Sequence, residues 1–275
     1  MMAIDWSETL QAPLVIDGKR LEYFCLGPTP DTAPTIVMLH EGLGCASLWR
    51  DFPGKVAEAT GMGVFVYSRA GYGQSDPVDL PRPLDFMTRE ATEVLPQILD
   101  AIGFQRGILF GHSDGATIAA IHAGSVEDFR VRGLIVMAPH FFTEPDGLAS
   151  IAEAKLAYDE GGLRERMAKY HRDPDVAFRG WNDVWLDPGF VKWNVAEVID
   201  YFRIPTLAIQ GRDDQYGTLR QIEAIEERAY SPVDMVVIDD CKHAPHLEQP
   251  EAVLAAVTEF AARLERIEAA EVETA

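Results

Sequence analysis

The chain has 275 residues, of which 47% are hydrophobic and 25% charged, the composition of an ordinary globular protein. This length suffices for one large domain with a deep core and room for a small insertion. The formal net charge of -20 argues against nucleic acid or an anionic membrane surface as a partner. Its three cysteines are widely separated and form no C-x-x-C pair, so neither a structural zinc site nor a disulfide framework is expected.

The sequence lacks the patterns of targeted and membrane-spanning chains. Residues 1–14 carry acids and no long apolar core, unlike a signal peptide. Elsewhere no apolar run approaches the roughly 20 residues that a membrane-crossing helix needs. We therefore predict a cytoplasmic protein with no membrane partner.

The predicted elements begin with a hairpin, in which residues 14–16 and 21–25 flank Asp17-Gly18, a pair typical of tight turns. Short runs rich in Val, Ile and Leu follow, as expected for parallel strands covered on both faces. These predicted strands span residues 35–39, 62–67, 107–110, 134–137, 206–209 and 235–238. Helical patterns lie between them and after them, including residues 91–102, where Pro96 should kink the helix, and residues 250–267. This alternation predicts an α/β fold with a mostly parallel, doubly wound sheet flanked by helices.

The alternation is interrupted between residues 141 and 202. This stretch has helical patterns at 151–158 and 163–170, three tryptophans and no convincing strand. We predict a core made of residues 1–140 and 203–275, with residues 141–202 inserted as a helical segment.

The most informative stretch is Gly111-His112-Ser113-Asp114-Gly115, which lies between an apolar run and a small-residue helical run. A serine in a sharp strand-to-helix turn, with glycines two residues away on either side, is typical of a nucleophile elbow. The glycines allow the helix to pass close to the strand. Ser113 is therefore the candidate nucleophile.

Serine is a poor nucleophile unless a base, usually histidine oriented by a carboxylate, activates it. Downstream of such an elbow the expected order is acid and then histidine. Asp213-Asp214 follows one predicted strand, and Asp239-Asp240 and His243 follow the next, where active sites of open α/β sheets collect. We predict His243 as the base, with His246 as its rival, and Asp214 as the acid, with Asp213 as the alternative.

We expect none of three other histidines, His112, His122 and His171, to be the base. His112 is adjacent to the serine but should point differently in the turn. We expect His122 to be packed or to face the surface of the elbow helix, and His171 to be solvated.

Acyl transfer also requires donors for the oxyanion of the tetrahedral intermediate. The backbone N–H of Asp114, directly after the nucleophile, is one candidate. The second donor is expected from the loop His40-Glu41-Gly42-Leu43-Gly44, which follows an early strand and whose glycines let a backbone approach a substrate.

Five motifs in order along the whole chain resemble the α/β-hydrolase family. They are residues 40–44, similar to the family's His-Gly-x-Gly oxyanion loop, residues 68–76, the elbow, residues 211–214 and residues 243–250. The resemblance implies an α/β-hydrolase fold with residues 141–202 as a cap, supports Asp214 and His243, and points to Gly42 as the second oxyanion donor. Two residues depart from the family pattern, because Glu41 and Ser68 replace a usual glycine and a frequent aspartate.

The serine at the elbow separates this chain from relatives resembling haloalkane dehalogenases and epoxide hydrolases, which use aspartate there. We predict a serine hydrolase of a small or medium carboxylic ester, acting through an acyl-enzyme. A carbon–carbon bond hydrolase, as in meta-cleavage-product hydrolases, or a lactonase with the same triad is the alternative. A non-catalytic ligand-binding protein is a remote one.

The expected partner is a small-molecule substrate, with no metal or organic cofactor. Members of the resembled family often form dimers, so a homodimer is a further expectation. Candidate substrate-binding residues lie in the oxyanion loop, after the strand at 134–137, in the insertion and after the acid: Glu41, His140, Phe142, Trp181, Trp185 and Tyr216.

Overall fold

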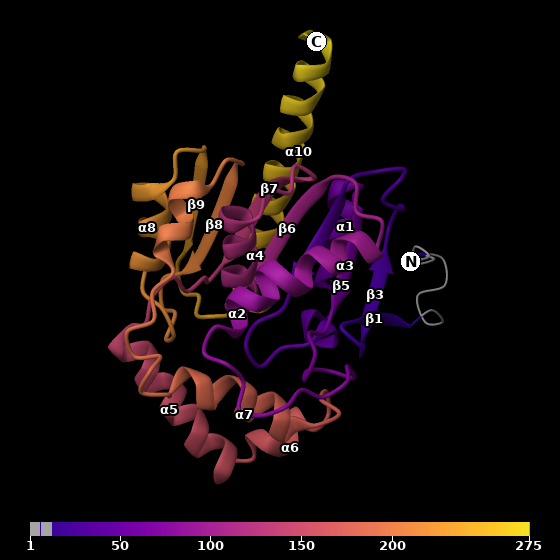
Figure 1. The fold of residues 1–275 in the computed structure, drawn as a ribbon. Coiled ribbons are helices and arrows are strands. Elements are labelled where there is room, and N and C mark those ends of the chain that lie inside the picture. Colours follow the sequence, from indigo (N-terminus) through magenta and orange to yellow (C-terminus); the bar gives the residue numbers. More distant parts are fainter. Residues whose placement is uncertain (1–5, 7–12, 275) are drawn as a thin grey trace.

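The computed structural model describes Trp6 and residues 13–274 as an α/β structure (Figure 1). Its main sheet has seven strands in the order β3-β5-β4-β6-β7-β8-β9. Strand β3 is antiparallel to β5, and every other neighbouring pair is parallel. The strands are β3 (Tyr23–Leu26), β4 (Thr35–Leu39), β5 (Gly63–Tyr67), β6 (Gly107–His112), β7 (Val131–Met137), β8 (Thr206–Gly211) and β9 (Val233–Ile238). The predicted fold class is confirmed, and the six predicted parallel strands are present with small shifts at their ends.

Helices cover both faces of this sheet. Val37 and Leu39 of β4 pack into the core on one face, and Ile36 and Met38 pack into the core on the other. Both faces are apolar because both are buried, which explains the unbroken hydrophobic runs. The helices are α1 (Phe52–Thr60), α2 (Phe86–Arg89), α3 (Leu95–Ala101), α4 (Asp114–Ser125), α5 (Pro145–Asp159), α6 (Leu163–Met167), α7 (Pro174–Trp185), α8 (Arg220–Arg228), α9 (Pro245–Glu248) and α10 (Pro250–Thr274), with 3-10 turns η1 (Ala46–Trp49) and η3 (Ala196–Tyr201) and a π-helical turn η2 (Glu90–Val94).

The predicted hairpin is only half correct. Strands β1 (Leu14–Ile16) and β2 (Lys19–Leu21) pair as a separate two-stranded sheet, but the predicted strand 21–25 is split at Glu22. The Glu22 N–H donates to Ser75 Oγ, and the Glu22 carbonyl accepts from the Ser68 N–H. These bonds turn the backbone out of the hairpin, and β3 then joins the edge of the main sheet.

The predicted helix at 91–102 is irregular where its proline intervenes. Residues Glu90–Val94 form a π-helical turn, and α3 begins at Leu95 with Pro96 in its first turn. A proline cannot donate the hydrogen bond of an α-helix interior, so it is tolerated at a helix start. The wider π-helical turn before it accommodates the backbone hydrogen bond that the proline cannot donate.

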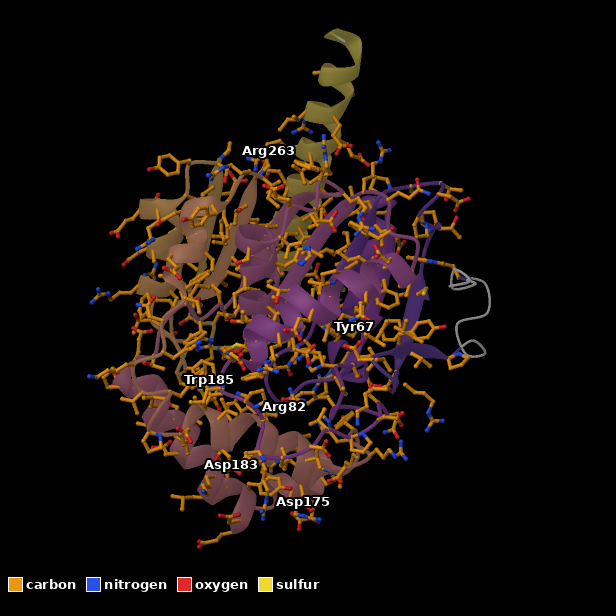
Figure 2. The ribbon with its side chains drawn as sticks, in the orientation of Figure 1. Tyr67, Arg82, Asp175, Asp183, Trp185 and Arg263 are labelled. Carbon is orange, nitrogen blue, oxygen red and sulfur yellow. The ribbon has the colours of Figure 1, made fainter. Side chains whose placement is uncertain are left out.

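The segment 141–202 contains α5, α6, α7 and η3, together with one isolated bridge between Phe142 and Asn194. Figure 1 shows α5, α6 and α7 gathered in a layer at the end of the molecule opposite the C-terminus of α10. In Figure 2, Trp185 and Arg82 lie in the zone between this layer and the sheet. The sheet and these helices thus enclose the region that follows β6.

Candidate active site

The turn after β6 holds Ser113 in a strained conformation. Its φ and ψ angles are 53° and -121°, in a region that non-glycine residues rarely occupy. The surrounding packing enforces this turn: a Cβ at Gly111 would lie 2.2 Å from the Gly115 carbonyl oxygen, and one at Gly115 would lie 2.2 Å from that of Leu39. Only glycine fits at either position, and the serine is left at the carboxyl end of the strand.

Three side chains from three strand ends meet at this turn. Ser113 Oγ lies 2.9 Å from Nε2 of His243, which follows β9. His243 Nδ1 lies 2.8 Å and 2.9 Å from the two carboxylate oxygens of Asp214, which follows β8. These distances place a base beside the hydroxyl and an orienting acid behind the base.

The Asp214 carboxylate is fixed by more than the histidine. Oδ2 accepts from the Gln210 amide at 2.7 Å, and Oδ1 accepts from the Tyr216 N–H at 2.8 Å. Burial favours the neutral acid, but His243 and the Tyr216 N–H outweigh it and lower the pKa of Asp214. Asp213 is exposed instead, and only its backbone N–H bonds to the loop at Cys241.

The rival base His246 lies away from the serine. Its ring is buried against Trp49, with ring centroids 4.7 Å apart, and against His112. Burial, and then the proximity of His112, lowers the pKa of His246 to about 3. It is therefore a neutral packed residue at neutral pH.

His112 points away from the pocket, as expected, and supports the loop that carries His243. Its Nε2–H donates to the His243 carbonyl at 2.6 Å, and its Nδ1 lies 3.5 Å from the Glu41 carboxylate.

The oxyanion loop is tied down through its carbonyl groups. His40 Nδ1–H donates to the Glu41 carbonyl at 2.7 Å, and His40 Nε2 accepts from the Arg69 N–H at 3.0 Å. The buried Arg69 guanidinium donates to the carbonyls of both His40 and Glu41. Both predicted oxyanion donors, Gly42 and Asp114, line one cavity with Ser113.

This cavity has a volume of about 180 Å³ and is small for a ligand site. It is lined by residues of the elbow, the oxyanion loop, the β8–α8 loop and the helical segment: Glu41, Gly42, Leu43, Ser113, Asp114, His140, Ile151, Trp181, Trp185, Tyr216 and His243. The Trp181 indole covers the oxyanion loop so closely that a Cβ at Gly42 would lie 2.2 Å from its Nε1.

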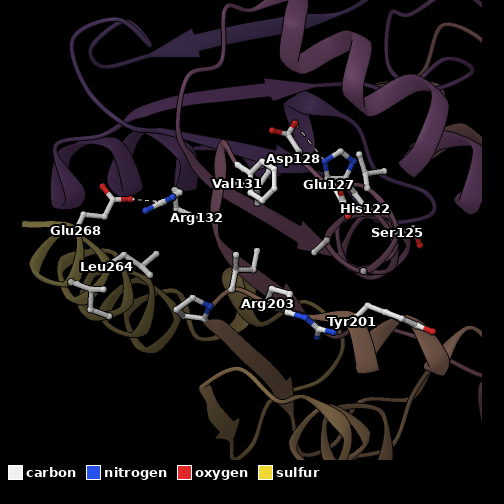
Figure 3. A pocket seen from close by; sticks show the side chains of 17 residues that line it. His122, Ser125, Glu127, Asp128, Val131, Arg132, Tyr201, Arg203, Leu264 and Glu268 are labelled. Atoms are coloured by element: carbon white, nitrogen blue, oxygen red, sulfur yellow. Dashed lines mark hydrogen bonds and ion pairs between the residues drawn. The ribbon is translucent and has the colours of Figure 1, made fainter. Parts of the chain in front are cut away.

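A larger groove of about 640 Å³ lies elsewhere (Figure 3). Its walls are the end of α4, the start of β7, the chain entering β8 and one side of α10. These are the amino ends of parallel strands, opposite the strand ends that carry Ser113. The groove contains none of the predicted site residues.

A sequence profile of the alpha/beta hydrolase family matches residues 36–256, which hold all three side chains described above. The chain belongs to the alpha/beta hydrolase family. Among curated proteins it is similar to a putative esterase/lipase of Mycoplasma genitalium, with 22% identity over 220 residues, covering 69% of this chain and 78% of that protein.

Solved structures share this hydrolase fold. A thermophilic esterase from Thermogutta terrifontis superposes with a TM-score of 0.71 and 18% identity, covering 92% of this chain and 97% of that one. An enol-lactonase from Burkholderia xenovorans superposes with a TM-score of 0.68 and 18% identity, covering 90% and 99%. At such identities the structures establish the common fold.

Most of the predicted substrate-binding residues of this hydrolase lie around the cavity, but Phe142 does not. Its backbone pairs with Asn194, and its carbonyl accepts from Gln221 at 3.1 Å, which directs the chain away from the pocket two residues after His140. Leu43 and Ile151 line the cavity without having been predicted, since single aliphatic residues carry no distinguishing sequence signal.

The expectation that His171 is solvated is wrong. The residue is 3% exposed, its Nδ1 accepts from the Gly73 N–H at 3.0 Å, and its Nε2–H donates to the Leu43 carbonyl at 3.1 Å. It links the helical segment to the oxyanion loop. His122 is packed, with Nδ1–H donating to the Ala91 carbonyl at 2.8 Å.

Two further properties concern partners and ions. Within residues 13–274 no helix is both long and apolar enough to cross a membrane. No group of three or more His, Cys, Asp or Glu side chains in that described range is arranged to hold a metal ion.

Proposed function

We propose that this hydrolase cleaves a small or medium carboxylic ester with Ser113 as nucleophile, His243 as base and Asp214 as orienting acid. The observation that carries the proposal is the 2.9 Å approach of Ser113 Oγ to His243 Nε2, with Asp214 on the opposite ring nitrogen.

In the first step His243 Nε2 takes the proton of Ser113 as Oγ attacks the ester carbonyl carbon. His243 then gives the proton to the departing alcohol, leaving an acyl-enzyme. Water, activated by the same nitrogen, attacks the acyl carbon and releases the acid. Asp214 keeps Nδ1 protonated and stabilises the positive charge on the ring in each transition state.

The developing oxyanion is assigned to the backbone N–H groups of Gly42 and Asp114. Asp114 is the first residue of α4, so its N–H belongs to a helix end with no intrahelical acceptor. The Arg69 bonds to the carbonyls of His40 and Glu41 hold the other side of this site in place before substrate arrives.

Residues 141–202 are proposed to act as a cap. Ile151 of α5 and Trp181 and Trp185 of α7 supply one wall of the cavity. A volume of about 180 Å³ favours a short acyl group. A lactone is a cyclic ester, so lactonase activity would use the same steps. A cytoplasmic location and a homodimer stay predictions.

Ester turnover by a Ser113→Ala variant tests the proposal. With p-nitrophenyl esters of two to eight carbons, wild type should prefer the short chains, and Ser113→Ala should lose roughly a thousandfold or more in kcat/KM. Ser47→Ala, an exposed serine outside the site, is the matched control and should keep its activity. A Ser113→Ala loss within about tenfold would overturn the nucleophile assignment. An inactive wild type would favour carbon–carbon substrates or a non-catalytic role.

A further inference from the structure

The charge of the cavity points to a substrate class. Glu41 and Asp114 both line it, and none of its lining residues is Lys or Arg. His140 does not offset the two acids, since burial and the neighbouring His243 lower its pKa to about 4 and keep it neutral at neutral pH. The lining in front of Ser113 therefore contains two acids and no base that is charged at neutral pH other than the candidate base His243, while the guanidinium groups of Arg69 and Arg82 act on Asp114 from outside the lining.

Asp114 is the unusual member of this pair. The residue is fully buried, and neither carboxylate oxygen has a hydrogen-bond partner of normal geometry among the described residues. The indole Nε1 of Trp185, on the cap side of the same cavity, likewise makes no hydrogen bond of normal geometry, although it lies close enough to the Asp114 carboxylate to lower the pKa of that group. Buried polar groups in native proteins nearly always have partners, and leaving one unpaired is costly. A hydrogen-bonding group of a ligand that reached this side of the cavity would supply a partner for both side chains.

Glu41 supplies the second acid from the oxyanion loop. Its side chain is 27% exposed, and one oxygen lies 3.5 Å from His112 Nδ1. Burial opposes ionisation, but the proximity of His112, and then of His40 and His246, lowers the pKa of Glu41 well below its usual range. Glu41, one of the residues that line the cavity, is thus ionised, and it directly precedes the proposed oxyanion donor Gly42 in the sequence.

We propose that the acyl group of the substrate carries a primary ammonium, recognised by the carboxylates of Asp114 and Glu41. This proposal rests on the proposed ester hydrolysis and alters none of its bond-forming or bond-breaking steps. We place the ammonium on the acyl part because the acyl part stays attached to Ser113 until water releases it and occupies a small cavity. An ammonium offers three donors, and ionic hydrogen bonds are stronger than neutral ones. Acyl groups that end in a carboxylate are disfavoured by repulsion.

Three nearly isosteric esters test this assignment: p-nitrophenyl 3-aminopropanoate, butanoate and hemisuccinate. They place an ammonium, a methyl or a carboxylate at the same distance from the scissile carbonyl. At about pH 7.5, kcat/KM is divided by the uncatalysed hydrolysis rate for the aminopropanoate and the butanoate, which removes their difference in intrinsic reactivity. The hemisuccinate is compared by kcat/KM alone, because its own carboxylate attacks the ester and inflates its uncatalysed rate. We expect a preference for ammonium over methyl of about tenfold to a hundredfold, and the hemisuccinate to be the poorest substrate.

The variants Asp114→Asn and Glu41→Gln keep the side-chain size and should each reduce the ammonium-to-methyl ratio by about tenfold. The ratio is taken within one protein, so a general loss of activity cancels. Asp213→Asn, an exposed acid next to the site, is the control and should keep the wild-type ratio.

The outcomes separate the two proposals. If wild type hydrolyses the butanoate through Ser113 but prefers methyl, or if the ratio survives both substitutions, the ammonium assignment is overturned while ester hydrolysis stands. If none of the three esters is turned over above a Ser113→Ala background, the ester proposal itself fails.

Discussion

The ring nitrogen Nε2 of His112 lies 2.6 Å from the carbonyl oxygen of His243. His112, the residue before Ser113, thus holds the backbone of His243, whose ring contacts Ser113. This bond crosses from β6 to the loop after β9 and fixes the separation of the proposed nucleophile and base. A small change in the distance between two catalytic groups can lower the reaction rate strongly.

The His112→Leu variant should therefore lower kcat by about tenfold to a hundredfold with a smaller change in KM. His122→Leu is a matched control, since His122 is also buried and also donates to a carbonyl, that of Ala91 at 2.8 Å, but far from the site. Both variants should be destabilised, which thermal unfolding would measure. Equal losses of kcat in the two would contradict a positioning role for His112.

The acid assignment is tested by two neighbouring substitutions. Asp214→Asn keeps the shape but no longer fixes the tautomer of His243, and should lower kcat by about a thousandfold to ten thousandfold. Asp213→Asn changes an exposed side chain and should stay within about twofold. A larger loss in Asp213→Asn would reverse the assignment.

The buried Asp114 carboxyl should make stability depend on pH. Burial raises the pKa of Asp114 from its ordinary 3.8 to about 6, despite the opposing effects of Arg69 and Trp185. Ionisation is thus less favourable in the folded state, so the stability linked to this group is complete below about pH 3.8 and is lost as the pH rises through about 6.

Asp114→Asn removes that dependence. The unfolding free energy of the variant, relative to wild type, should rise by about 2 kcal/mol between pH 4 and pH 7. Urea unfolding of both proteins across this range measures it, and titrations common to the two cancel. A difference that stays flat with pH would mean that Asp114 is not buried as a charge.

The elbow glycine Gly115 should tolerate no side chain. Gly115→Ala would place a Cβ 2.2 Å from the Leu39 carbonyl oxygen, so a strand or a helix must move, and a loss of several kcal/mol is expected. Gly54→Ala is the opposite case, because nothing lies within 4 Å of its Cβ in α1, and it should be neutral or stabilising by about 0.5–1 kcal/mol. Similar melting temperatures for both variants would contradict the packing at the elbow.

The sequence allowed the sheet and the elbow to be predicted because both depend on local patterns. Buried parallel strands are apolar throughout, as in β4, and the spacing of Gly111, Ser113 and Gly115 is set by one turn. The order of acid and histidine after the last two strands then identified Asp214 and His243 as candidates.

What could not be predicted depends on contacts between distant segments. The burial of His171 requires Gly73 and Leu43, which lie about a hundred residues away in sequence. The split at Glu22 is imposed by Ser68 and Ser75, and Phe142 leaves the pocket by pairing with Asn194. That Asp114 is a buried acid beside Trp185 emerges only when α7 is placed against the elbow.

Incubation with a fluorophosphonate probe, followed by mass spectrometry of the modified peptide, tests whether Ser113 is a nucleophile activated by His243. We expect one adduct, on Ser113, that is absent in Ser113→Ala and slowed by orders of magnitude in His243→Ala. No adduct in wild type, an adduct on another residue, or labelling that is indifferent to His243→Ala would contradict it.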